Sequence, residues 1–160
     1  MNTELCRVDG AHLNKEKIQE AAEIIRRGGL VAFPTETVYG LGGDGLNPDS
    51  SRAIYAAKGR PSDNPLILHI ASREELLPLV SEIPEAAEKL MDAFWPGPMT
   101  LVFKKSAIVP METTGGLKTV AIRMPSHPVA KALIEAAGVP IAAPSANTSG
   151  RPSPTQAARQ

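Results

Sequence analysis

The sequence has almost no cysteine and no long hydrophobic run. Cys6 is the single cysteine among the 160 residues, which excludes an internal disulfide and a cysteine metal cluster. No run of about 18 apolar residues is present, so the sequence predicts no membrane-spanning helix and no membrane partner. The chain opens with polar residues and lacks the pattern of a signal peptide. We therefore expect a protein of the cytoplasm.

A net charge is also absent. Lys plus Arg and Asp plus Glu each number 17, so attraction of the whole molecule to nucleic acid is not expected. The charge is uneven, however, because residues 101–160 hold seven basic and only two acidic residues. This local excess suits an anionic small molecule or a local RNA contact.

Hydrophobic and charged residues, at 42% and 21%, give the balance of one globular domain. Apolar periodicity predicts helices over 15–27, 48–58, 84–94 and 126–137, with one more after a capping box at Ser72 and Glu75. Short apolar runs predict strands over 30–33, 66–70, 99–103, 119–124 and 140–143, and 40–45 is expected to be a glycine-rich loop. The alternation indicates an α/β domain with a mixed sheet. The chain ends at what resembles a helix start, so we expect domain 1–160 to stop short of its C-terminal end.

Three polar segments, 34–40, 58–61 and 145–150, are candidates for a ligand site beyond the ends of strands. In the second, Lys58 and Arg60 flank one glycine and suit a polyphosphate, with Asn64 able to point into the same loop. The alternative is a solvated helix end, where cations face the helix dipole favourably. In the third, Ser145 and Asn147 would lie on one side of an extended backbone, although both residue types also favour turns.

The predicted strand 119–124 places Thr119, Ala121 and Arg123 on one face. The small Ala121 leaves room for a ligand, so Arg123 is a candidate carboxylate or phosphate clamp. An ion pair with a neighbouring carboxylate is the alternative. His69 shares a strand face with Ile67 and has no metal-ligand spacing to another histidine, so it is either a hydrogen-bonded core residue or part of the site.

Two glycine patterns do not carry a nucleotide site. Gly40, Gly42 and Gly45 have the spacing of a dinucleotide-binding fingerprint, but a polar segment separates them from the preceding strand. The segment 115–119 resembles a P-loop, yet it leads into a strand instead of a helix. If the protein binds ATP, it uses another architecture.

Taken together and in order, the motifs resemble the YrdC-like family of threonylcarbamoyl-AMP synthases. The matching stretches are FPTETVYGL (33–41), KGRP (58–61), NPLILHI (64–70), WPGPMT (95–100), IRMP (122–125) and PSANTSG (144–150). The resemblance covers residues 15–158. It implies a single YrdC-like α/β domain with an open twisted mixed β-sheet, flanking helices and a large ligand cavity.

The resemblance also implies a nucleotidyltransferase. Such enzymes condense L-threonine, bicarbonate and ATP, which is accompanied by Mg²⁺, to threonylcarbamoyl-AMP and pyrophosphate. A separate transferase then moves the threonylcarbamoyl group to tRNA. The alternative is a module that binds double-stranded RNA or tRNA without catalysis of its own, through salt-sensitive phosphate contacts.

The implied site has two parts. Lys58 and Arg60 would be the catalytic residues that hold the phosphates. The nucleotide would also contact Asn64, Thr119, Ser145, Asn147 and Ser153. Threonine would be held by Thr35, Thr37, His69, Arg123 and the backbone of Ala143, with His69 and Arg123 at its carboxylate.

Overall fold

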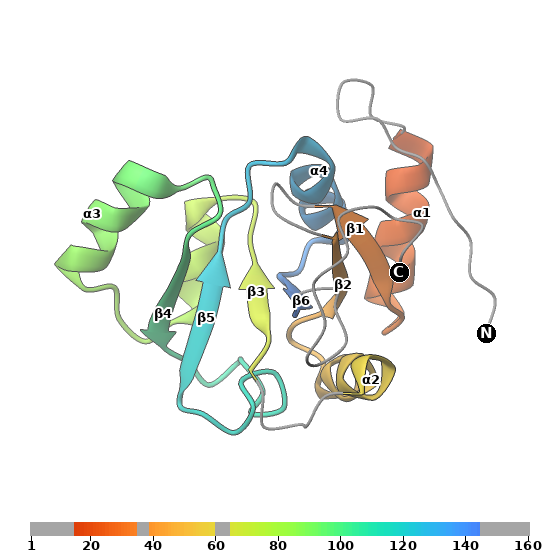
Figure 1. Ribbon diagram of the computed structural model, residues 1–160, viewed down its shortest axis with the longest axis horizontal. Coiled ribbons are helices and arrows are strands. Elements are labelled where there is room, and N and C mark those ends of the chain that lie inside the picture. The colour runs from red at the N-terminus through yellow and green to blue at the C-terminus, as the bar shows by residue number, and fades with distance from the viewer. Residues whose placement is uncertain (1–14, 35–38, 60–64, 145–160) are drawn as a thin grey trace.

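The computed structural model describes residues 15–34, 39–59 and 65–144. They form a six-stranded mixed sheet in the order β1-β2-β6-β3-β5-β4, flanked by helices (Figure 1). The strands are β1 (Val31–Pro34), β2 (Tyr39–Asp44), β3 (Ile67–His69), β4 (Thr100–Lys104), β5 (Thr119–Arg123) and β6 (Ile141–Ala143). The helices are α1 (Lys15–Arg26), α2 (Pro48–Lys58), the 3-10 helix η1 (Arg73–Leu79), α3 (Glu85–Phe94) and α4 (Pro128–Ala137). None of them, within the described ranges, is long and apolar enough to cross a membrane.

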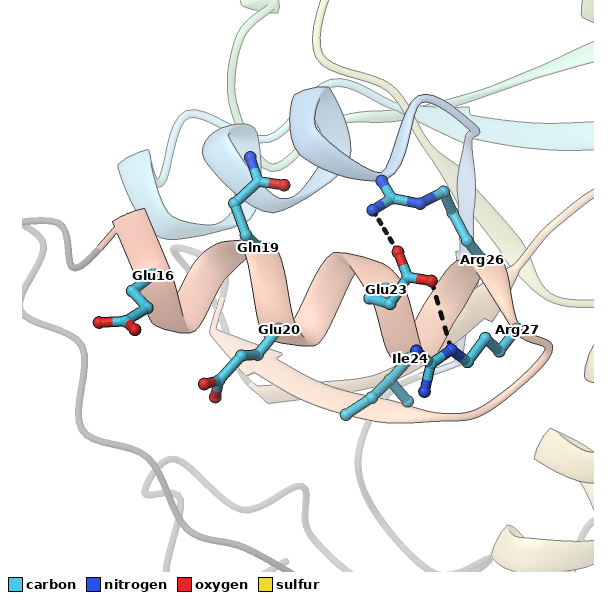
Figure 2. Close-up of a pocket in the computed structure, with 7 residues that line it drawn as sticks. All are labelled: Glu16, Gln19, Glu20, Glu23, Ile24, Arg26 and Arg27. Atoms are coloured by element: carbon cyan, nitrogen blue, oxygen red, sulfur yellow. Dashed lines mark hydrogen bonds and ion pairs between the residues drawn. The ribbon is translucent and has the colours of Figure 1, made fainter.

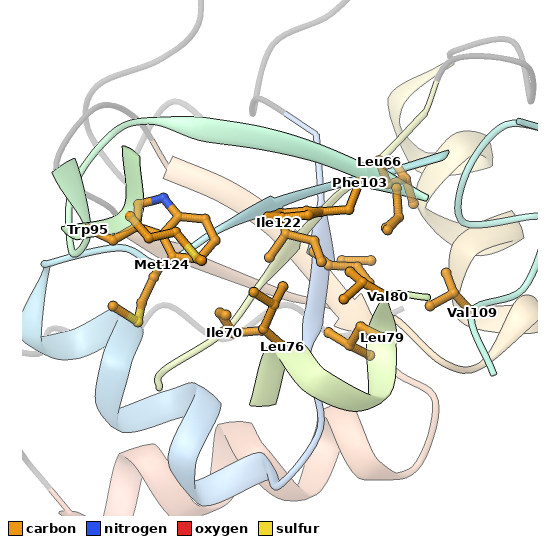
Figure 3. Packing of buried hydrophobic residues seen from close by; sticks show 14 of the residues in the cluster. Leu66, Ile70, Leu76, Leu79, Val80, Trp95, Phe103, Val109, Ile122 and Met124 are labelled. Atoms are coloured by element: carbon orange, nitrogen blue, oxygen red, sulfur yellow. The ribbon is translucent and has the colours of Figure 1, made fainter. Parts of the chain in front are cut away.

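One core packs against the face of the sheet that carries Leu68 and Ile122. It joins strands β3, β4 and β5 to α2, η1 and α3, and Figure 3 shows Leu76 and Leu79 of η1 in the same cluster as Ile122. Ile122 and Leu68 are fully buried. This core includes the even-numbered residues of β5, as the alternating sequence predicts.

A second core holds α1 and α4 beside β1 and β6. Phe33 and Ile141 from the strands meet Ala22 and Ile25 of α1 and Leu133 of α4. Figure 1 shows α1 and α4 together near β1, whereas α3 lies beside β4 at the other end of the sheet. One face of the sheet is therefore covered by α1 and α4 only in part.

The prediction of a glycine loop over 40–45 is wrong, because residues 39–44 form strand β2. Gly42 pairs with Val31 of β1. A Cβ atom on Gly42 would lie 2.5 Å from Cγ2 of Ile141 and 2.6 Å from the Phe33 ring. Glycine is present here for close packing inside a sheet, and its usual association with loops concealed the strand.

Two helix ends also differ from the sequence prediction. The capping box of Ser72 and Glu75 is present, but it opens a 3-10 helix that contains Pro78, which lacks the N–H donor an α-helix would use there. Helix α4 begins at Pro128 and not at the predicted residue 126, because His127 caps it: the Nδ1 atom of His127 accepts a hydrogen bond of 3.1 Å from the Val129 amide.

Candidate active site

The three polar segments singled out in the sequence all attach to one edge of the sheet. β3 and β5 run parallel, whereas the pairs β1–β2, β2–β6 and β6–β3 are antiparallel. The ends of β1 and β6 therefore lie at the same edge as the beginnings of β2, β3 and β5. Residues 34–40 connect β1 to β2, residues 58–61 precede β3, and residues 145–150 follow β6. The topology thus places the end of β1 and the end of β6, more than 100 residues apart in the sequence, at the same edge of the sheet.

Five of the predicted site residues lie in the described part of the chain: Lys58, His69, Thr119, Arg123 and Ala143. The other seven lie outside it, so their predicted roles stay predictions: Thr35, Thr37, Arg60, Asn64, Ser145, Asn147 and Ser153.

Four of the described site residues lie on strands and share one face of the sheet, whereas Lys58 lies at the end of α2. Arg123 pairs in register with His69, which in turn is opposite Ile141, and Ala143 is opposite Ile67 on the same face. Thr119 lies four residues before Arg123, about 13 Å along the strand. In the neighbouring strand Val102 is 65% exposed, so within the described residues this half of the face is not covered by a helix. Among the described residues, the face beside β5 is therefore open at this position.

Arg123 is held in place by the turn between α3 and β4. Its side chain is 6% exposed, and Nε donates a hydrogen bond of 3.1 Å to the carbonyl oxygen of Gly97. The Gly97 amide in turn donates to the carbonyl oxygen of Met124 at 2.8 Å. Burial lowers the pKa of Arg123 from its ordinary value, yet a guanidinium remains charged at neutral pH. The residue is a fixed cation suited to a carboxylate or phosphate.

His69 is a buried, hydrogen-bonded histidine on the interior strand β3, on the same face of the sheet as Arg123. Its Nδ1 atom lies 3.1 Å from the carbonyl oxygens of both Ile67 and Ile141, so Nδ1 carries the proton and donates. Its ring meets Phe33 edge to face, with centroids 5.7 Å apart. Burial lowers the pKa of His69 to about 4 despite these carbonyls. At neutral pH the imidazole is therefore uncharged, and Nε2 is a hydrogen-bond acceptor.

Lys58 is the last residue of α2 and is half-buried. Asn47 caps the start of this helix, and Gly59 ends it in the left-handed region, with φ of 64°. Only glycine adopts this conformation without strain, so the glycine between Lys58 and Arg60 turns the chain out of the helix at this point. The sequence interpretation of a helix that stops at a glycine-separated cation pair is confirmed up to Gly59.

Sequence reasoning missed two groups that support the site. One is the Gly97 carbonyl, whose motif WPGPMT was quoted in the resemblance without a role. A Cβ atom on Gly97 would lie 2.6 Å from the backbone oxygen of Phe94, so the turn accepts only glycine without rearrangement. The other is Thr113, a fully buried residue between β4 and β5. Its partners are distant in sequence, and no local pattern indicates them.

Two surface hollows, one over α1 and one between α1 and α4, are not lined by residues of this half of the face. The larger one, of about 700 Å³, lies over α1 and the residue after it, where Glu23 bonds Arg26 at 2.7 Å and Arg27 at 3.3 Å (Figure 2). These contacts lower the pKa of the Glu23 carboxyl. None of its lining residues is a predicted site residue. The large ligand cavity stays a prediction.

The described ranges contain no group of three His, Cys, Asp or Glu side chains that could hold a metal ion. A magnesium ion that arrives with a nucleotide does not need one, because Mg²⁺ keeps several waters and binds mainly through the phosphates. Mg²⁺ as the companion of ATP stays a prediction.

Comparison with known proteins supports the resemblance. The model of the Sua5, YciO and YrdC family, described as "Telomere recombination", matches residues 23–159. The threonylcarbamoyl-AMP synthase of Pyrococcus abyssi is 62% identical over 141 residues, which is 88% of this chain and 42% of that protein. That of Halorhodospira halophila is 42% identical and covers 84% of this chain and 71% of that protein.

Solved structures agree with these relatives. The crystal structure of P. abyssi Sua5 complexed with L-threonine has a TM-score of 0.90 and 60% identity, over 92% of this chain and 43% of that one. E. coli YciO has a TM-score of 0.75 and 30% identity, over 84% of this chain and 65% of that one. The chain spans less than half the length of several relatives that it matches. From the matched residues and the shared fold, this chain belongs to the Sua5/YciO/YrdC family.

Proposed function

We propose that the chain carries the threonylcarbamoyl-AMP synthase site and makes threonylcarbamoyl-AMP and pyrophosphate from L-threonine, bicarbonate and ATP. The observation that carries the proposal is the face of β5, where a fixed Arg123 and Thr119 are about 13 Å apart beside an uncovered part of the sheet. A cation at one end and a nucleotide contact at the other suit an amino acid joined to AMP. Similarity to a synthase and to a threonine-bound structure supports this assignment.

In the proposed reaction the threonine amine attacks the carbon of bicarbonate, and water leaves to give a carbamate. A carbamate oxygen then attacks the α-phosphorus of ATP, and the bond to the β-phosphate oxygen breaks to release pyrophosphate. Positioning and stabilisation of phosphate charge govern such transfers. Lys58 and Arg60 would stabilise that charge, with Asn64, Ser145, Asn147 and Ser153 as further nucleotide contacts.

At the other end of the face, Arg123 would bind the threonine carboxylate. It is a buried cation whose orientation is set by Gly97, which favours a bidentate ligand of fixed geometry. Thr35, Thr37, His69 and the backbone of Ala143 would complete this subsite. In this role the protein works in the cytoplasm and supplies a transferase that modifies tRNA.

Release of pyrophosphate tests the proposal. The assay contains ATP, Mg²⁺ and bicarbonate, with L-threonine, with L-serine or with neither. It is run on this chain and on any longer product of its gene, because several relatives are more than twice as long. We expect release that depends on both threonine and bicarbonate. No such release from either form would overturn the proposal, and binding of tRNA that weakens steeply with salt would then favour the RNA-binding alternative.

A further inference from the structure

Outside the residues proposed to contact substrate, two buried hydroxyl groups form a hydrogen-bonded pair that links three segments of the chain. Thr113, between β4 and β5, and Ser51, on α2, are both fully buried. Their hydroxyl oxygens lie 2.7 Å apart. The Thr113 hydroxyl also donates to the carbonyl oxygen of Gly45 at 2.8 Å. A hydroxyl has one proton, so the Ser51 hydroxyl must donate to Thr113.

The backbone of Thr113 makes a third connection. Its carbonyl oxygen accepts a hydrogen bond of 3.0 Å from the Leu66 amide, immediately before β3. A single residue is thereby bonded to the turn before α2, to α2 itself and to the entry of β3. On the surface above it, Glu112 pairs with Arg52 of α2 at 3.0 Å.

These contacts lie on both sides of the segment that carries the cation pair. Ser51 precedes Lys58 by seven residues in the same helix, and Leu66 follows Arg60 by six residues. A rigid helix transmits the position of Ser51 to Lys58, and the Leu66 contact fixes the residue just before β3. The position of Lys58 relative to the start of β3 thus depends on Thr113.

The geometry points to Thr113 as a positioning residue for ATP: it fixes α2, which ends at Lys58, relative to the start of β3 without touching substrate. This inference rests on the proposed function, because it takes the phosphates to bind at Lys58 and Arg60. Arg123 is held separately, through Gly97, so threonine binding does not depend on Thr113.

The neighbouring Thr114 provides a matched control. It is 1% exposed, but its hydroxyl contacts only the carbonyl oxygens of Met111 and Leu117, in its own loop. Thr113→Val and Thr114→Val therefore delete the same group at equal burial, and only the first deletes a bond to α2 and the turn before it. Thr113→Ser restores the hydroxyl, and Ser51→Ala removes the α2 contact alone.

The experiment measures the KM for ATP and for threonine in pyrophosphate release, together with equilibrium binding of ATP and the urea midpoint. We expect Thr113→Val to raise the KM for ATP about tenfold or more with the threonine KM unchanged, since small displacements cost large factors. Thr113→Ser should restore the ATP KM, and Thr114→Val should lower only the urea midpoint.

The inference would be overturned if Thr113→Val and Thr114→Val changed the KM for ATP equally, or if Thr113→Val left it unchanged. If Thr113→Val does not fold, Ser51→Ala and Thr113→Ser carry the same comparison. A wild-type chain without threonine-dependent release would instead overturn the proposed function, and ATP binding by the variants would still decide the role of Thr113. A wild-type chain that binds no ATP would overturn both.

Discussion

The burial of His69 in the folded protein keeps its imidazole uncharged at neutral pH. Its Nδ1 proton lies between the carbonyls of Ile67 in the same strand and Ile141, 72 residues away, and the second of these contacts has no local signal in the sequence. In the proposed site such a neutral group would offer threonine a hydrogen-bond acceptor at Nε2, and Arg123 would supply the positive charge. The proposed roles of the two side chains would thus differ, whereas the sequence predicted both at the carboxylate.

The free energy of unfolding should decrease at acidic pH because of His69. Its pKa is about 4 in the folded protein and 6.5 in the unfolded chain. As pH falls below 6.5, His69 therefore takes up a proton in the unfolded state before it does so in the folded state. The free energy of unfolding decreases by about 3 kcal/mol between pH 6.5 and 4, and this group causes little further decrease below pH 4.

Urea unfolding of wild type and His69→Asn at several pH values between 7 and 4 measures this effect. The difference in unfolding free energy between the two proteins should shrink as pH falls. Parallel pH profiles for the two proteins would show that His69 does not titrate as its burial demands.

Gly42 should be the least replaceable residue of β2. In Gly42→Ala the new methyl group meets buried Ile141 and Phe33 at 2.5 and 2.6 Å, and such overpacking costs about 1–3 kcal/mol. Gly40→Ala is the control in the same strand, because its Cβ would lie 3.4 Å from its nearest neighbours. Urea midpoints of the two variants should differ clearly, and equal midpoints would contradict the packing argument.

At the scale of elements, the cap of α4 can be tested directly. The Nδ1 atom of His127 accepts from the Val129 amide, so His127→Ala should cost about 1 kcal/mol, whereas His127→Asn should keep most of the cap. Burial lowers the pKa of His127, which keeps Nδ1 unprotonated at neutral pH. Thermal unfolding at pH 7 measures both variants, and a loss as large for Asn as for Ala would show that the hydrogen bond is not what stabilises α4.

The turn between α3 and β4 should govern threonine binding. In Gly97→Ala the methyl group would meet the Phe94 carbonyl at 2.6 Å, so the turn must shift and carry the acceptor of Arg123 with it. We expect the threonine KM to rise about tenfold or more with a smaller change for ATP, the reverse of Thr113→Val. Steady-state kinetics of Gly97→Ala measures both KM values, and a rise in the KM for ATP alone would contradict a role of this turn in threonine binding.

The elements were largely predictable because their signals are local. Asn47 and Pro48 begin α2 and Gly59 ends it, as the sequence indicates. The faces of β5 follow from simple alternation. Strand β2 was missed because its glycines serve contacts with Phe33 and Ile141, which only the folded chain brings near.

At the scale of the whole molecule, the two ends of β5 should have separable functions. Arg123→Ala should raise the threonine KM by about tenfold or more, since truncating a buried charged partner is costly, and should raise the ATP KM far less. Lys58→Ala should show the opposite pattern. Both are measured by pyrophosphate release, and equal effects of Arg123→Ala on both substrates would move Arg123 to the nucleotide end.

The order of strands could not be predicted from the sequence. The apolar runs identify strands one at a time, whereas the sheet joins His69 to both Arg123 and Ile141 across more than 50 residues. Only the registers show that β1 and β6 end where β2, β3 and β5 begin. The motifs predicted the site residues one segment at a time, and the registers show that His69, Arg123 and Ala143 share a face.

The position of β6 has a consequence for synthesis of the protein. β6 is the last described strand in chain order, yet it lies between β2 and β3 and pairs with both. During translation the β1–β2 hairpin and the β3–β5–β4 unit therefore cannot join into one sheet until residue 143 has left the ribosome. Contacts this distant in sequence make folding slow and leave unpaired strand edges exposed to aggregation. A nascent chain stopped before Ile141 would thus expose the unpaired edges of β2 and β3.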